Sequence, residues 1–142
     1  MKGWLLDTNV IASLIAANGA PSVKTWAAAQ DEARLFLSVL TLGEYDKGIA
    51  KLAEDNPDRA RFAEARDRLE DRFEGRILAV SDRVVRRWGA LSGTIQRDTG
   101  HPPPVIDTLF AATAIEHELC FVTRNVKDVV RTGVVILNPW EA

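Results

Sequence analysis

The sequence predicts an α/β fold in which helices cover both faces of a parallel sheet. Short apolar runs of strand length alternate with segments of helical periodicity along the whole chain, a pattern typical of parallel sheets. Acidic residues follow several of these runs, where the ends of parallel strands would meet. The chain of 142 residues has the length of one domain and shows no repeat or low-complexity tract. We therefore expect a single domain over residues 1–142.

The first elements follow from an apolar run and two turn signals. Lys2–Leu6 is the expected first strand, and it ends abruptly at Asp7. A helical pattern covers Val10–Ala17 and stops at Asn18-Gly19, a common C-terminal signal. Proline favours the first position of a helix, so we expect a second helix over Pro21–Gln30.

The middle of the chain predicts a strand and two long helices. Leu35–Val39 has strand length, and a helix should follow over Thr41–Ala53. Asn56 and Pro57 form a cap and a first helical position, and the helix that they begin should end at Phe73. We expect its Phe62, Leu69 and Phe73 to face inward. Acidic and basic residues alternate between them, which favours a solvated face over a strip for binding RNA.

The remaining elements complete the alternation. Ile77–Val80 is a short strand, and Ser81 should cap a helix whose Val84, Trp88, Leu91 and Ile95 belong to the core or to a subunit interface. The later segments are a proline-rich loop at 99–104, a helix over Val105–Glu116, a strand over Leu119–Val122, a turn into a short helix at Thr123–Asp128, and a last strand over Val134–Leu137.

Composition limits the class of protein. The net charge of −2 lacks the basic excess usual in nucleic-acid-binding domains, although a metal ion can bring phosphate to an acidic pocket. No apolar run approaches the roughly 20 residues of a membrane span, and the first residues do not have the pattern of a signal peptide. Cys120 is the single cysteine, which fits a reducing cytoplasm.

Acids and an amide lie at places that a parallel sheet would bring together. These residues are Asp7, Glu44, Asp107, Asn125 and Asp128. Each lies near the carboxyl end of an expected strand or in a helix close to that end of the sheet, so all should share one edge. Taken alone, Asp7 could equally be a helix cap.

Crowded carboxylates repel one another unless a cation neutralises them. Hard divalent ions such as Mg²⁺ prefer oxygen ligands and keep waters that substrate phosphate can replace. Such an ion can also activate a water molecule, so the cluster indicates metal-assisted hydrolysis of phosphodiesters. A phosphotransfer enzyme with Asp7 as nucleophile is less favoured, because Asn9 stands where a second aspartate is needed.

Five segments, in order along nearly the whole chain, carry a resemblance to a known family. They are Leu5-Leu6-Asp7-Thr8-Asn9-Val10, Ser38-Val39-Leu40-Thr41-Leu42-Gly43-Glu44 with Gly48, Asp107-Thr108-Leu109-Phe110-Ala111-Ala112-Thr113-Ala114, Val122-Thr123-Arg124-Asn125-Val126-Lys127-Asp128 and Leu137-Asn138-Pro139-Trp140. The chain resembles PIN-domain ribonucleases, in particular the VapC-like toxins of type II toxin–antitoxin pairs.

The resemblance implies an α/β/α sandwich, cleavage of RNA that depends on Mg²⁺ or Mn²⁺, a homodimer, and an antitoxin that blocks the pocket. By position, Asp7 and Asp107 would be the principal metal ligands, and Glu44 would complete the set or orient the attacking water. Thr123 and Asn125 would support the acids through hydrogen bonds.

The departure from the family pattern is Asn125, where many PIN domains have an acid. Asp128 could face the same pocket if its segment is helical, or it could simply cap the short helix. A PIN fold that binds without catalysis is therefore the alternative function.

Overall fold

The structure is a computed structural model that describes residues 1–141. Its centre is a five-stranded parallel sheet with the strand order β3-β2-β1-β4-β5. The strands are β1 (Trp4–Leu6), β2 (Leu35–Ser38), β3 (Ile77–Leu78), β4 (Cys120–Val122) and β5 (Ile136–Leu137). Since β1 lies in the middle, the residue that follows it lies at the centre of the carboxyl edge of the sheet.

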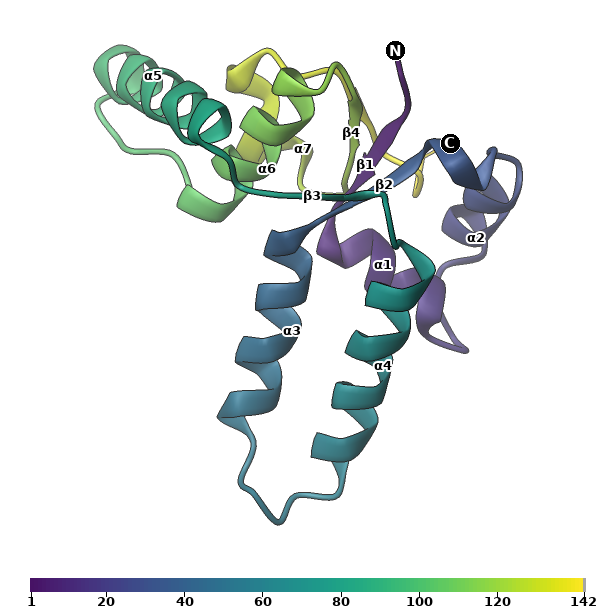
Figure 1. Ribbon diagram of the computed structural model, residues 1–142. Helices are drawn as coiled ribbons and strands as arrows, with labels where there is room; N and C mark the ends of the chain where they lie inside the picture. Colours follow the sequence, from purple (N-terminus) through teal and green to yellow (C-terminus); the bar gives the residue numbers. More distant parts are fainter. Residues whose placement is uncertain (142) are drawn as a thin grey trace.

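Helices connect the strands and cover the sheet (Figure 1). They are α1 (Thr8–Ile15), α2 (Pro21–Ala28), α3 (Val39–Lys51), α4 (Asp58–Arg72), α5 (Asp82–Thr99), α6 (Val105–Glu116) and α7 (Val126–Val129). Two short 3-10 helices, η1 (Glu32–Arg34) and η2 (Val130–Thr132), are also present. Among the residues described, no helix is long and apolar enough to cross a membrane.

Neighbouring residues of β1 supply the cores on the two faces of the sheet, because successive side chains of a strand point to opposite faces. Leu6 belongs to the cluster formed with α1, α2 and the end of α4, which includes Val23 and Leu69. Leu5 belongs to the cluster formed with α6, in which the rings of Phe110 and Phe121 stack with centroids 5.5 Å apart. The expected α/β/α sandwich is therefore confirmed.

Helices α3 and α4 form an arm that projects away from the sheet (Figure 1). Arg66 of α4 joins the two helices, since its Nε lies 2.8 Å from the Asp46 carboxylate of α3 and its guanidinium also pairs with Glu70. Arg59 of α4 also contacts α3, since its Nε donates to the Ile49 carbonyl at 3.3 Å, so two arginine side chains join the helices of the arm.

The elements lie where the sequence predicts them, with shorter strands and small shifts at the ends. Helix α3 begins two residues before the expected Thr41, because the Ser38 hydroxyl accepts a hydrogen bond from the Leu40 N–H at 3.0 Å and caps it there. Ser81 caps α5 as expected.

The prediction for one core residue, Phe62, was wrong. Phe62 is 37 % exposed, whereas Leu69 and Phe73 are buried. The first turns of α4 lie on the projecting arm, beyond the reach of the sheet, so helical periodicity identified the correct face of α4 but not where the core ends.

Candidate active site at the carboxyl edge of the sheet

Asp7 is the buried centre of the site, with 5 % of its surface exposed. It directly follows β1, and its Oδ1 accepts a hydrogen bond from the Thr8 N–H at 2.7 Å at the start of α1. Its Oδ2 accepts the Thr123 hydroxyl at 2.6 Å and the Asn9 side-chain amide at 3.3 Å. Asp7 is therefore a helix cap, and it is also joined to the segment after β4.

The carboxyl of Asp7 resists ionisation. Its pKa is raised from the ordinary value of 3.8 to about 6, mainly by burial and to a smaller extent by the negative charges of Asp107 and Glu44. The hydrogen bonds from Thr123 and Thr8 act in the opposite direction, because they stabilise the ionised form. A nearby cation would reverse the balance and ionise the group at neutral pH.

Glu44 reaches the same place from the first part of α3. Its Oε1 accepts the Thr8 hydroxyl at 2.7 Å. The Thr8 oxygen also lies 2.9 Å from the hydroxyl oxygen of Thr41. A hydroxyl has one proton to donate, so Thr41 donates to Thr8 while Thr8 donates to Glu44. Thr8 thus joins Glu44 to Asp7 through its side chain and its backbone N–H.

Asp107 lies in the first turn of α6, and the segment after β4 brings a further charge toward it. Burial raises the pKa of Asp107, and the negative charges of Asp128 and then Glu44 add to the effect. Asp128 lies in α7, so the helical segment that the sequence predicts does place its charge near Asp107.

Asn125 contributes through its backbone. Its N–H donates to the Thr123 hydroxyl oxygen at 3.0 Å, and that hydroxyl in turn donates to Asp7. The Asn125 residue is exposed, and its side chain makes no capping hydrogen bond at the start of α7. The structure therefore couples Asp128, rather than the Asn125 side chain, to the charge of the other acids.

The acids influence one another's charge without forming a closed cage. Among residues 1–141, no three acidic, histidine or cysteine side chains are close enough together, as they stand, to surround a metal ion. The donors available at this edge are all oxygen atoms, which fits Mg²⁺ or Mn²⁺ better than a softer metal. The Asn9 Oδ1 next to Asp7 is buried and has no hydrogen-bond partner in the described part of the chain. These features fit a hard divalent ion held by few carboxylates and completed by water.

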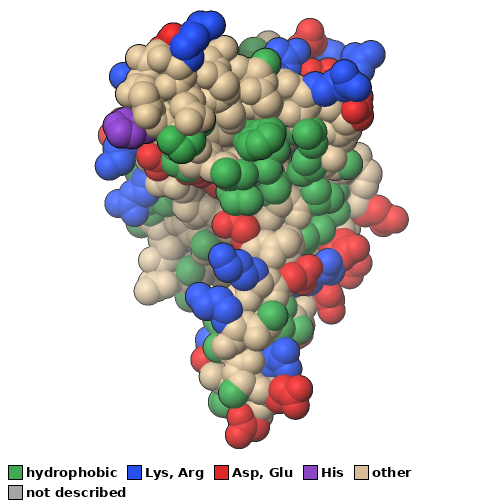
Figure 2. All heavy atoms as spheres, turned by 90° about the vertical axis from the view of Figure 1, so that its left-hand side faces the viewer, with side chains coloured by type: hydrophobic (Ala, Val, Ile, Leu, Met, Phe, Trp, Pro, Cys, Tyr) green, Lys and Arg blue, Asp and Glu red, His purple; other side chains and the backbone are tan. Residues whose placement is uncertain are grey.

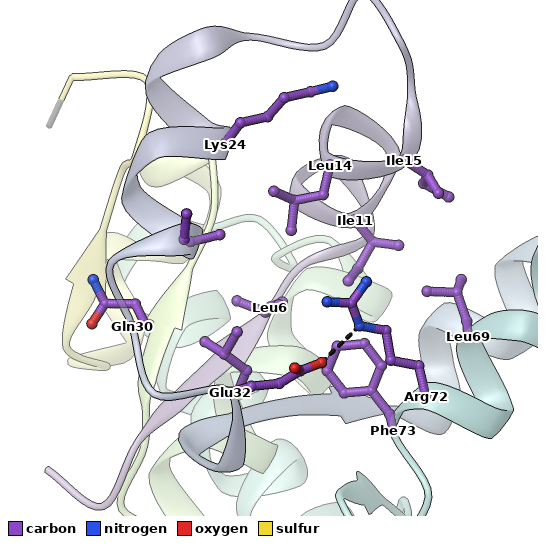
Figure 3. A pocket seen from close by; sticks show the side chains of 13 residues that line it. Leu6, Ile11, Leu14, Ile15, Lys24, Gln30, Glu32, Leu69, Arg72 and Phe73 are labelled. Atoms are coloured by element: carbon purple, nitrogen blue, oxygen red, sulfur yellow. Dashed lines mark hydrogen bonds and ion pairs between the residues drawn. The ribbon is translucent and has the colours of Figure 1, made fainter.

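Two hollows border α1, and one of them lies beside Glu44. A groove of about 370 Å³ runs beside Glu44 and is lined by Thr8, Ala12, Glu44, Tyr45, Gly48 and Phe62. A second hollow, of about 380 Å³, lies among α1, α2 and α4, where Leu6, Ile11 and Leu14 contribute apolar side chains (Figure 3). At the edge of this second hollow the Arg72 guanidinium donates to the Glu32 carboxylate at 2.7 Å (Figure 3).

Residues 4–132 match the PIN domain family, a range that spans β1 to β4, α1 to α7 and every acid described above. The chain belongs to the PIN domain family. It is 30 % identical over 145 residues to a VapC ribonuclease, Y4jK, of Sinorhizobium fredii, and the match covers 96 % of this chain and 97 % of the relative. It is 26 % identical over 136 residues to toxin FitB of Neisseria gonorrhoeae, with 96 % and 97 % covered.

The fold of this PIN domain is also found among solved structures. The crystal structure of FitAcB from Neisseria gonorrhoeae superposes with a TM-score of 0.84 at 27 % identity, over 98 % of this chain and 99 % of that chain. The resemblance to PIN-domain, VapC-like toxins that the sequence indicates is therefore confirmed.

Neither Thr8 nor Thr41 was predicted from the sequence as a site residue. In the PIN domain, Thr8 contacts both Glu44 and Asp7, and the Thr41 hydroxyl pairs with the Thr8 hydroxyl. A signal existed for Thr41, which precedes Glu44 by three residues and thus shares its helix face. The Arg124 guanidinium, next to Thr123 in the chain, lies 5.1 Å from the ring centroid of Trp140.

Proposed function

We propose that this protein is an endoribonuclease that depends on a divalent metal and acts as the toxin of a type II toxin–antitoxin pair. The observation that supports the proposal is the coupling of Asp7, Glu44 and Asp107 at one edge of the sheet: the charges of Asp107 and Glu44 hinder ionisation of Asp7, and the charge of Glu44 also hinders ionisation of Asp107. Such a cluster is costly in the absence of a cation, so it favours a role in binding one.

Asp7 and Asp107 would hold Mg²⁺ or Mn²⁺, with Glu44 as a third ligand or as the group that orients the attacking water. A bound ion would supply a more acidic water and would stabilise the charge that develops on the phosphate. Thr123 orients Asp7, and Thr8 orients Glu44, so the two carboxylates are fixed before substrate arrives. Asp128 adds a fourth charge beside Asp107, and Asn125 acts through Thr123.

The partners follow from the same family membership. The relatives named VapC ribonuclease and toxin FitB support RNA as the substrate and a cognate antitoxin as the inhibitor, in the cytoplasm.

We also propose a homodimer. Exposed aliphatic residues at the starts of α3 and α6, namely Val39, Val105 and Ile106, support this, and hydrophobic side chains gather on that side of the molecule (Figure 2). Light scattering should then give about 31 kDa, twice the chain mass of 15.7 kDa.

A PIN fold that binds without cleaving is the second candidate. It is favoured by the amide at Asn125 and by the lack, among the residues described, of a ready three-ligand cluster. A chain of this kind would bind its partners without hydrolysing RNA in Mg²⁺ or Mn²⁺.

Replacing Asp7 with Asn tests the first proposal. We expect Asp7→Asn to lower RNA cleavage in Mg²⁺ or Mn²⁺ by at least about a hundredfold, because an amide binds the ion poorly. Asp31→Asn is the matched control, since Asp31 is an exposed helix cap that also accepts a backbone N–H. Undiminished cleavage by Asp7→Asn would contradict the assigned role, and no cleavage by the unsubstituted chain would favour the second candidate.

A further inference from the structure

The groove beside Glu44 is continuous with the acidic site. Thr8 and Glu44, which belong to the hydrogen-bonded chain that leads to Asp7, also line the groove. The other lining residues come from α1, from the next turn of α3, and from Phe62 near the start of α4. A substrate with a phosphate at the acids would therefore place a neighbouring group directly over this groove.

Gly48 keeps the groove open. A Cβ atom at this position would meet no atom within 4 Å, and Gly48 lies inside α3, where glycine weakens a helix relative to alanine. Neither packing nor a left-handed backbone thus requires glycine at position 48, which lines the groove with open space beside it. The feature that glycine preserves is room for a ligand against the helix.

Two aromatic rings form the outer part of the groove. Tyr45 is half-buried, and Phe62 is exposed although it lies on the apolar face of α4. The guanidinium of Arg61 lies 5.2 Å from the centroid of the Phe62 ring, so a positive charge accompanies the ring. Exposed aromatic rings next to basic groups are the usual surface on which proteins stack unpaired bases.

Basic residues continue from Glu44 along α3. Lys47 and Lys51 follow Glu44 by three and seven residues, so they lie on the same face of the helix, and both are exposed. Figure 2 shows basic and acidic side chains mixed along the arm, and the basic residues of α3 are these two lysines. These charges complement a phosphate backbone that runs from the acids along the arm.

We propose that this groove holds an unpaired base of the RNA next to the phosphate that is cut, with Phe62 and Tyr45 as stacking rings and Gly48 as the open floor. The proposal rests on the ribonuclease function proposed above and names the part of the PIN domain that selects the substrate. The volume of about 370 Å³ lies within the range of sites for small ligands, which begins at about 300 Å³.

The test uses a long mixed-sequence single-stranded RNA, Mg²⁺, and sequencing of the fragment ends, which measures both rate and base preference. Gly48→Ala and Phe62→Ala should lower kcat/KM by about tenfold to a hundredfold, the range that loss of one stacked base gives. They should also alter the preferred base beside the cut. Phe62→Trp and Tyr45→Phe keep a ring and should stay within about threefold of the unsubstituted chain.

Gly43→Ala is the matched control, because Gly43 also lies in α3 with open space around it but does not line the groove. Gly43→Ala and Gly48→Ala should both melt at or above the temperature of the unsubstituted chain, so a loss of activity in Gly48→Ala cannot come from unfolding.

Two results would overturn the proposal in different ways. If the unsubstituted chain cleaves RNA and the groove variants keep its rate and base preference, the ribonuclease stands and the groove holds no base; a protein partner then becomes its occupant. If the unsubstituted chain cleaves no RNA, the proposed function fails and the groove proposal fails with it.

Discussion

Asp7 uses one carboxylate oxygen to accept the first N–H of α1 and the other to accept the Thr123 hydroxyl. The sequence leaves open whether this residue is a cap or a site residue, and the structure shows that one carboxyl group makes both sets of contacts. Each hydrogen bond favours the ionised form, yet burial outweighs them and the pKa stays at about 6. The folded state therefore favours the neutral form of Asp7, and ionisation of this carboxyl lowers the stability of the fold.

The pH dependence of stability follows from that pKa. The value for Asp7 is about 6 in the folded chain against 3.8 ordinarily, so the folded state binds the proton more tightly. Without metal, the tighter proton binding stabilises the folded state fully below pH 3.8. This stabilisation is lost as the pH rises through 6, which lowers the free energy of unfolding by about 3 kcal/mol. Denaturant unfolding in EDTA at a series of pH values would show this, and Asp7→Asn should remove that part of the slope.

Thr123 offers a second test at the scale of one hydroxyl group. Thr123→Val keeps the shape but removes the donor to Asp7 and the acceptor for the Asn125 N–H. We expect a loss of about 1–3 kcal/mol at pH 8, where Asp7 is ionised, and a smaller loss at pH 5. Thr123→Ser should retain most of the stability. Equal losses at both pH values would show that the hydroxyl does not act through the Asp7 carboxylate.

At the scale of elements, strand ends and helix starts position the acids. Asp7 ends β1, and the starts of α3 and α6 bring Glu44 and Asp107 to the same edge. These elements were predictable because their signals are local: apolar runs of strand length, helical periodicity and the prolines before α6. The cap at Ser38 was not predicted, so the expected start of α3 was two residues late. The 3-10 helices η1 and η2 were not predicted, because a single turn leaves no periodic pattern.

Removing the cap of α3 should affect the site as well as stability. Ser38→Ala leaves the Leu40 N–H without its acceptor, which we expect to cost about 1 kcal/mol, within a range of about 0.5–2 kcal/mol. Ser81→Ala removes the equivalent bond of α5, to the Val84 N–H, and should cost a similar amount. Thermal unfolding measures both losses. Only Ser38→Ala should also lower RNA cleavage, since α3 carries Glu44; equal activity of the two variants would contradict this link.

At the scale of the whole molecule, the parallel sheet brings acids that repel one another to one edge, and its two apolar cores stabilise this arrangement. Five parallel strands direct their carboxyl ends to one edge, and the apolar cores on both faces hold them there while the acids repel. A cation at that edge would stabilise the entire fold, because a ligand that binds the folded state alone shifts the unfolding equilibrium.

We therefore expect Mg²⁺ or Mn²⁺ to raise the melting temperature at pH 7.5. At a concentration one hundred times the dissociation constant, the gain is about 2.7 kcal/mol. The gain should be smaller at pH 5, because Asp7 with a pKa of about 6 is then mostly protonated. It should vanish in Asp7→Asn and persist in Asp31→Asn. A gain of equal size in Asp7→Asn would place the ion elsewhere on the chain.

The sequence by itself determined the alternation of strands and helices, the parallel sheet, the PIN resemblance and the acids that follow the strands, because propensity, capping and periodicity act between residues near in the chain. It could not determine that Thr8 connects Asp7 with Glu44 and that the Thr41 hydroxyl pairs with Thr8, or that Asp128 and not the Asn125 side chain adds charge beside Asp107. Nor could it show that Phe62 stands exposed over a groove. Tertiary structure decided these, because they depend on distances between side chains that the sheet brings together from remote parts of the chain.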